Sequence, residues 1–298
     1  MDDKRTQHRP KLPPWIRIKV GCGQAREEVS SILTGLRLNT VCSSARCPNL
    51  NECWHRRTAT FMILGEHCTR NCRFCAVGHT QSPLPPDLEE PARLAAAAAK
   101  MELKYVVVTS VTRDDLPDGG AGHFAAVITA LRHTLPEAGI EVLTPDFNGD
   151  VEALKTVLAA GPTVFNHNVE TVERLSGQIR SKANYRRSLA VLKAAAEIGG
   201  GRVPVKSGIM AGLGETDDEL VQTLKDLREA GVSILTIGQY LPPSAQHWPL
   251  DRYVEPEKFD EWGRIAREMG FSFVASAPLV RSSYNAAELI AKKLTANN

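Results

Sequence analysis

The sequence lacks any run of 18 apolar residues, so no membrane-spanning helix is expected. Residues 1–15 contain no apolar segment of the kind found in secretion signals. Two aspartates follow the initial methionine, which argues against a transit peptide. Basic residues interleaved with aromatic ones are also missing, so nothing indicates nucleic-acid binding. We therefore expect a cytoplasmic protein that binds neither membrane nor nucleic acid.

The composition is that of a globular protein, with 43% hydrophobic and 23% charged residues in a chain of 298. The net charge of +2 conceals an uneven distribution, because residues 1–20 carry six Lys or Arg against two Asp. Such a basic terminus either attracts an acidic partner protein or forms a solvated tail.

Six of the seven cysteines form two triplets within residues 42–75, and neither triplet contains a fourth cysteine. The first triplet, Cys42, Cys47 and Cys53, has the spacing C-x4-C-x5-C. The second, Cys68, Cys72 and Cys75, has the spacing C-x3-C-x2-C. Three thiolates on a short loop can hold three corners of a cubane iron–sulfur cluster. The fourth iron is then left for a ligand from elsewhere.

Other uses of these cysteines fit less well. A structural zinc site usually has four ligands and closed coordination. Cys72 and Cys75 form one pair of the kind that such sites use, but the rest of the pattern fits poorly. Disulfides need an oxidising compartment. An electron-transfer cluster is expected to be fully ligated. The seventh cysteine, Cys22, stands apart and is interpreted as a spare thiol.

From Thr58 onward, apolar strand patterns alternate with amphipathic helix patterns. Six expected strands begin at 58, 105, 140, 163, 203 and 233, and stretches with helical periodicity lie between them. This alternation predicts parallel strands with right-handed crossovers. We expect an α/β fold, an incomplete (β/α)6 TIM-like barrel spanning residues 58–275. An N-terminal extension (1–57) and a C-terminal tail (276–298) are expected to cover the barrel mouth.

The chemically interesting residues follow the expected strands. The second cysteine triplet follows the first strand, Asn168 and Glu170 end the fourth, and 210–215 and 239–243 follow the fifth and sixth. The loops after the strands form the working face of such barrels. We therefore expect one site at this face.

The second triplet, with Phe74 just before its last cysteine, resembles the radical S-adenosylmethionine (SAM) superfamily. The resemblance implies that the open iron binds SAM, which is then cleaved to a 5′-deoxyadenosyl radical. It also implies a SAM contact at Phe74 and further contacts in three downstream motifs. These contacts are Gly119 and Gly120 (where Ala121 replaces the usual glutamate), Asn168 and Glu170, and Met210. A glycine turn or a helix cap would explain the same residues without a ligand.

Both triplets together resemble lipoyl synthases. So do the segments PPWIRIKV (13–20), VLTPDFNG (142–149), NHNVETV (166–172), SGIMAGLGE (207–215), GQYLPPS (238–244) and VRSSYNA (280–286). The resemblance covers about residues 10–290. It implies two 4Fe–4S clusters, with SAM consumed as a co-substrate, and sulfur insertion at carbons 6 and 8 of a protein-bound octanoyl chain. The cluster on the first triplet is the sulfur source.

The same resemblance implies a fourth ligand for the first triplet. Ser283 of the RSSY motif is the expected ligand, with Ser282 as the second choice, and Arg281 either anchors the tail or lies on the surface. The implied partners are octanoylated lipoyl carrier proteins, namely the glycine cleavage H protein and E2 subunits of 2-oxoacid dehydrogenases. A ferredoxin- or flavodoxin-like electron donor and an iron–sulfur carrier are also implied.

Two alternatives remain at this point. Another radical SAM sulfur-inserting enzyme, of the biotin synthase or methylthiotransferase type, would share the second triplet. It should lack the spacing of the first triplet and the RSSY tail. A non-catalytic iron–sulfur electron-transfer protein would leave the strand-end motifs unexplained.

Overall fold

A curved sheet of eight strands forms the centre of the computed structural model, which describes residues 11–17, 24–56, 58–283 and 286. In spatial order the strands are β1 (Asn39–Thr40), β2 (Thr60–Ile63), β5 (Tyr105–Ser110), β6 (Gly139–Leu143), β7 (Val164–Asn166), β8 (Val205–Ala211), β9 (Ile234–Gln239) and β10 (Phe273–Ser276). All neighbours from β2 to β10 pair in parallel, and β1 pairs antiparallel with β2.

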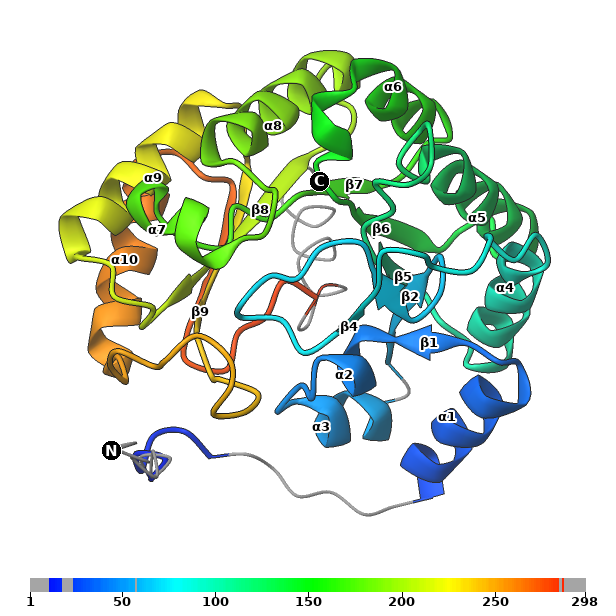
Figure 1. The fold of residues 1–298 in the computed structure, drawn as a ribbon, viewed down its shortest axis with the longest axis horizontal. Helices are drawn as coiled ribbons and strands as arrows, with labels where there is room; N and C mark the ends of the chain where they lie inside the picture. The colour runs from blue at the N-terminus through cyan, green and yellow to red at the C-terminus, as the bar shows by residue number, and fades with distance from the viewer. Residues whose placement is uncertain (1–10, 18–23, 57, 284–285, 287–298) are drawn as a thin grey trace.

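Helices lie around the outside of this curved sheet (Figure 1). The helices are α1 (Gln24–Gly35), α2 (Val41–Ser44), α3 (Leu50–His55), α4 (Glu90–Lys100), α5 (Ala121–Thr134), α6 (Val151–Ala159), α7 (Glu173–Ile179), α8 (Tyr185–Gly199), α9 (Asp217–Glu229) and α10 (Pro256–Glu268). A 3-10 turn, η1 (Phe147–Gly149), follows β6, and the short strands β3 (His67–Cys68) and β4 (Gly78–His79) pair with each other.

Side-chain alternation along the strands separates two apolar regions. Val106 and Val108 of β5 belong to the main core that the helices cover. Val107, between them, belongs to a second cluster with Val164 and Ile234 of other strands. Because successive side chains on a strand point to opposite faces, the sheet is buried on both sides. This explains why its strands read as continuous apolar runs.

The predicted incomplete barrel is confirmed, with one parallel strand more than expected. β10 pairs with β9 in the register Phe273 to Ile234, although its side chains are only half-buried and give little apolar signal. A capping box begins α9: the Thr216 side chain accepts the backbone N–H of Glu219, and the Glu219 side chain accepts the backbone N–H of Thr216.

The segment after β10 runs back against the inner side of the sheet. The N–H of Gln239 donates to the carbonyl of Pro278 over 3.1 Å, and the Asn49 side chain donates to the carbonyl of Leu279 over 2.8 Å. A Cβ atom on Gly238 would lie 2.1 Å from the Val280 carbonyl oxygen, so only glycine permits this approach. The tail therefore joins the N-terminal extension to the barrel.

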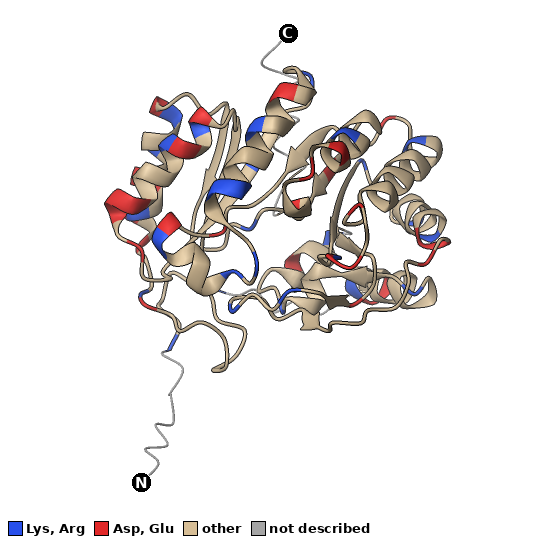
Figure 2. Cartoon of the chain, turned by 45° about the horizontal axis from the view of Figure 1, so that its top comes forward, with Lys and Arg blue, Asp and Glu red and all other residues tan. Residues whose placement is uncertain are grey.

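Charged side chains of both signs are mixed along the outer helices (Figure 2). Ion pairs join some of them, such as Arg174 with Glu219 and Arg186 with Glu173, each at 2.6 Å. In the described part of the chain, no helix is both long and apolar enough to cross a bilayer.

A buried ion pair lies inside the barrel. The Lys206 ammonium donates to the two oxygens of Glu141 over 2.7 and 3.0 Å, and neither side chain is exposed to solvent. Tyr105 and Asn166 donate to the same carboxylate, each over 3.0 Å. Four neighbouring strands, β5 to β8, thus contribute one residue each to the group.

We predict that Lys206→Met destabilises the protein strongly, because it leaves the Glu141 charge buried without a counter-charge. The expected loss is about 3–5 kcal/mol in the free energy of unfolding. In the double variant Lys206→Met/Glu141→Gln the charge is gone. The Gln oxygen can still accept from Asn166 while its NH2 group donates to the Tyr105 hydroxyl, so the loss should be smaller. Denaturant unfolding of the apoprotein measures both, and equal losses in the single and double variants would contradict the prediction.

Candidate functional site

A cavity of about 690 Å³ lies at the mouth of the barrel, lined by the strand ends, the N-terminal extension and the tail. It collects most of the residues that the sequence singled out. Its lining includes five of the six triplet cysteines and seven other predicted residues: Cys42, Cys47, Cys68, Cys72, Cys75, Phe74, Asn168, Glu170, Met210, Arg281, Ser282 and Ser283. The predicted convergence of the strand-end motifs is thus present in the fold.

The second triplet lies on the loop that begins at the end of β3. Each of its sulfurs accepts hydrogen bonds from backbone N–H groups. The N–H groups of Arg70 and Thr112 donate to Cys68, each over 3.3 Å. The N–H of Ser181 donates to Cys72, and that of Val77 donates to Cys75. Such bonds stabilise a thiolate more than a thiol.

Burial acts in the opposite direction on two of these thiols. It raises the pKa of Cys75 to about 12 and raises the pKa of Cys72 as well. Without a metal these groups are therefore protonated at neutral pH. Binding iron must displace the protons, and the N–H donors then face the resulting thiolates.

The first triplet lies on two short helices of the N-terminal extension and on the segment between them, which contains Cys47. Cys42 is in α2 and Cys53 in α3, and the N–H of Cys47 donates to the carbonyl of Cys42 over 3.0 Å. Cys53 does not line the cavity, but it is close enough to Cys42 and Cys47 for their charges to affect it. Burial, followed by these two neighbours, raises its pKa to about 12. The three thiols therefore form one group.

The donor sets fit iron–sulfur clusters. In the described ranges, no three His, Cys, Asp or Glu side chains converge closely enough to bind one metal ion. A cubane does not require such convergence, because each thiolate binds a different iron. Each triplet supplies three sulfurs and no fourth, as a cluster with one open iron needs.

Asn168 and Glu170 lie at the end of β7, against the tail. The Asn168 amide donates to Glu170 over 3.1 Å and to the hydroxyl of Ser282 over 2.7 Å. Its own oxygen is buried and has no hydrogen-bond partner among the described residues. Buried polar atoms are normally paired, so an unpaired one at a cavity indicates a place for a polar ligand.

Two further residues of this kind were missed in the sequence. The hydroxyls of Ser110 and Thr144 are also buried, line the cavity and have no partner among the described residues. Ser110 ends β5, and Thr144 follows β6 directly. A polar residue that closes an apolar strand is the signal that could have identified them.

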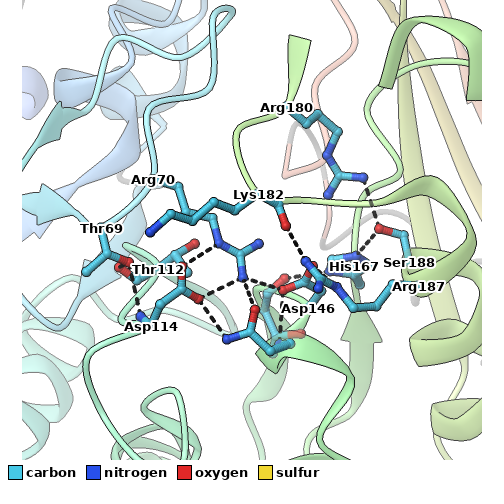
Figure 3. Close-up of polar contacts among 12 residues, drawn as sticks. Thr69, Arg70, Thr112, Asp114, Asp146, His167, Arg180, Lys182, Arg187 and Ser188 are labelled. Atoms are coloured by element: carbon cyan, nitrogen blue, oxygen red, sulfur yellow. Dashed lines mark hydrogen bonds and ion pairs between the residues drawn. The ribbon is translucent and has the colours of Figure 1, made fainter. Parts of the chain in front are cut away.

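Arg180 is a third residue that sequence reasoning missed. It lines the cavity, and its guanidinium donates to the hydroxyl of Ser188 over 2.9 Å (Figure 3). It also donates to the carbonyl of Val169 over 3.2 Å. Burial raises the pKa of Glu170, while the charge of Arg180 acts in the opposite direction. Nothing in the spacing around Arg180 distinguishes it from the surface arginines of α7 and α8.

Gly119 and Gly120 do not line the cavity. Both have positive φ, at 61° and 92°, and they lead into α5. A Cβ atom on Gly119 would lie 3.0 Å from the Phe147 ring, and one on Gly120 would lie 2.4 Å from a methyl carbon of Leu64. In this structure the two glycines make room for their neighbours.

Met210 is in β8, and its N–H donates to the carbonyl of Glu170 over 2.9 Å. This bond fixes the end of β7 against β8. A Cβ atom on the preceding Gly208 would lie 2.9 Å from the Asn168 oxygen and 2.9 Å from the Ser282 hydroxyl. Glycine at this position thus allows the tail to reach Asn168.

The two serines of the tail differ in their contacts. Ser282 is bonded to Asn168, whereas the Ser283 hydroxyl makes no hydrogen bond to another described residue. Arg281 donates to the carbonyls of Val280 and Pro278, over 2.7 and 3.3 Å, and therefore stabilises the turn of the tail itself. Cys22 lies outside the described residues.

Two family models match the chain. One is described as the radical SAM superfamily and covers residues 62–227. The other is described as the N-terminal domain of lipoyl synthase of the radical SAM family and covers residues 2–47. The first includes the second cysteine triplet, and the second includes Cys42 and Cys47.

Curated relatives match nearly the full length. A lipoyl synthase from Rubrobacter xylanophilus is 55% identical over 93% of this chain and 85% of its own. A lipoyl synthase from Chlorobium phaeovibrioides is 52% identical over 93% of this chain and 96% of its own. Among solved structures, an FeFe-hydrogenase maturase from Carboxydothermus hydrogenoformans has a TM-score of 0.55 at 14% identity, over 90% of this chain and 78% of its own, which supports the fold alone. On these matches and this cavity, the chain belongs to the lipoyl synthase family of the radical SAM superfamily.

Proposed function

We propose that the protein inserts two sulfur atoms into an octanoyl chain, at carbons 6 and 8, while the chain is amide-linked to a lysine of a carrier protein. The observation that carries this proposal is that thiols of both triplets line one cavity. Carbons 6 and 8 have no neighbouring group that stabilises a carbanion, so acid–base catalysis cannot activate them. A radical donor and a sulfur donor must then act at one place.

Cys68, Cys72 and Cys75 bind a 4Fe–4S cluster that leaves one iron open for SAM. When bound, this cluster and SAM supply a 5′-deoxyadenosyl radical, and the second cluster supplies the sulfur. Asn168 offers SAM its unpaired amide oxygen, and Glu170 is held beside it by a hydrogen bond. Further polar atoms come from Ser110 and Thr144, and Phe74 and Met210 contribute apolar surface to the same wall.

Cys42, Cys47 and Cys53 bind the second cluster, with Ser283 as the ligand of its fourth iron. Asn168 already engages the hydroxyl of Ser282, which leaves that of Ser283 as the available one. An alkoxide is a harder ligand than a thiolate and holds this iron less durably. A site that gives up sulfur needs such a labile corner.

The cavity also has an apolar part that suits an acyl chain. Val41, Met62, Val111 and Leu143 contribute to its lining. They lie on the N-terminal extension and on the first strands of the barrel, near both groups of cysteines. This surface would hold the octanoyl chain and exclude water from it.

The carrier protein is an octanoylated glycine cleavage H protein or an E2 subunit of a 2-oxoacid dehydrogenase. A ferredoxin or flavodoxin supplies electrons, an iron–sulfur carrier rebuilds the second cluster, and all of these proteins act in the cytoplasm. The family assignment supports this set of partners, because the reaction needs a protein-bound acyl chain and a strong reductant.

We predict that Cys42→Ala separates SAM cleavage from sulfur insertion. After anaerobic reconstitution and incubation with SAM, dithionite and an octanoylated peptide, this variant should form deoxyadenosine but add no sulfur. Cys68→Ala should do neither, because it lacks a ligand of the radical cluster. Mass spectrometry measures both products. Cys22→Ala is the control and should behave as the wild type, and deoxyadenosine formation by Cys68→Ala would contradict the assignment.

The two tail serines should differ in the same assay. Ser283→Ala removes the proposed iron ligand, so SAM cleavage should persist while sulfur insertion is lost. Ser282→Ala removes one hydrogen bond to Asn168, which is worth about 1 kcal/mol, or about fivefold in SAM affinity. Equilibrium binding of SAM and the sulfur content of the peptide measure the two effects. An exchange of these two phenotypes would assign the iron to Ser282.

A further inference from the structure

Arg70 lies inside the second triplet, two residues after Cys68, and its side chain is only 4% exposed. Its guanidinium donates to both oxygens of Asp114, over 2.7 and 2.8 Å, and to Asp146 and Asn148, each over 2.8 Å (Figure 3). Asn148 also donates to Asp114 over 3.1 Å. Arg70 thus ties the cysteine loop to the loops that follow β5 and β6.

The loop after β6 has an unusual backbone. Phe147 and Asn148 have φ values of 44° and 52°, and Gly149 follows at 85°. Non-glycine residues in this region cost on the order of 1–3 kcal/mol each and persist where the surroundings impose them. Here the imposed conformation points Asp146 and Asn148 at one guanidinium, and the space beside Gly119 accommodates the Phe147 ring.

Thr69 adds a second connection, next to Arg70. Its hydroxyl accepts the N–H of Asp114 and donates to the carbonyl of Thr112, each over 3.0 Å, and its own N–H donates to the same carbonyl over 3.0 Å. Two consecutive residues of the cysteine loop are therefore fixed to residues 112–114.

These contacts determine what surrounds the sulfur of Cys68. It accepts the N–H of Arg70 from its own loop and that of Thr112 from the loop after β5, both over 3.3 Å. Both N–H groups can donate to the sulfur together only while the two loops keep their relative position. Thr69 and the side chain of Arg70 hold the loops in that position.

We propose that Arg70 and Thr69 are positioning residues that keep two N–H groups on the Cys68 sulfur and thereby raise the reduction potential of the cluster held by the second triplet. This inference rests on the proposed function, because it requires that cluster. Hydrogen bonds to the sulfurs stabilise the more negative, reduced state of an iron–sulfur cluster. SAM cleavage begins from that state.

The chain offers a matched control for the charge of Arg70. Arg187, on α8, donates to the other oxygen of Asp146 over 2.8 Å and also to the carbonyl of Lys182. Among the described residues, it makes no hydrogen bond to the cysteine loop (Figure 3). Arg187→Met removes one positive charge from Asp146, as Arg70→Met does. Only Arg70→Met also releases the cysteine loop from Asp114. Thr69→Val frees the loop without any change of charge.

The test is a redox titration of the reconstituted full-length protein, followed by electron paramagnetic resonance of the signal that changes on addition of SAM. In Arg70→Met and Thr69→Val the reduced-to-oxidised ratio at a fixed potential should fall about tenfold, equal to about 59 mV for a one-electron couple. Arg187→Met should titrate close to the wild type.

A second measurement uses the apoprotein and needs no cluster. Hydrogen exchange at the amides of Arg70 and Thr112 should be faster in Arg70→Met and Thr69→Val, and unchanged in Arg187→Met. Should Arg70→Met fail to retain iron, Thr69→Val decides the result, because it keeps the guanidinium and its contacts.

Wild-type potentials in Arg70→Met and Thr69→Val would overturn the proposal, and so would an equal shift in Arg187→Met, which would assign the effect to charge alone. In either case a wild-type protein that still cleaves SAM leaves the proposed function intact. A wild-type protein without any SAM-sensitive signal would instead refute the proposed function.

Discussion

The arrangement of the site depends on β2, a four-residue strand with a different partner on each edge. One edge pairs with β5 and makes β2 part of the barrel, and its end leads to the loop of Cys68. The other edge pairs with β1, and the chain leaves β1 directly into the helix that contains Cys42. Two cysteine groups separated in the sequence thus border one cavity because a single strand anchors both.

The tail completes this cavity through close backbone contact. Gly208 and Gly238, on neighbouring strands, leave space that any side chain would fill, and the segment from Val280 to Ser282 occupies it. Asn168 then bonds to Ser282, so the residue proposed to face SAM also holds the segment that carries Ser283. The Asn168 amide therefore connects the proposed SAM site with the tail that carries Ser283, and a change at one should alter the position of the other.

The sequence predicted the barrel and both cysteine groups, because apolar periodicity and ligand spacing are local properties. It missed β1 and β10, which are short and hold their place through backbone pairing. It also missed Ser110, Thr144 and the contacts of Arg70, whose importance depends on which loops meet in space. For Gly119 and Gly120 the local pattern is clear in the sequence, but their position in the fold is not. They contact Phe147 and Leu64, which do not line the cavity.

We propose that both groups of cysteines bind iron–sulfur clusters that face one cavity. A crystal structure of the anaerobically reconstituted protein with SAM, with an iron anomalous-difference map, tests it most directly. We expect two cubane-shaped peaks, one on Cys68, Cys72 and Cys75 and one on Cys42, Cys47 and Cys53, with SAM between Asn168 and the first. A single metal ion on either triplet, or SAM bound elsewhere, would contradict it.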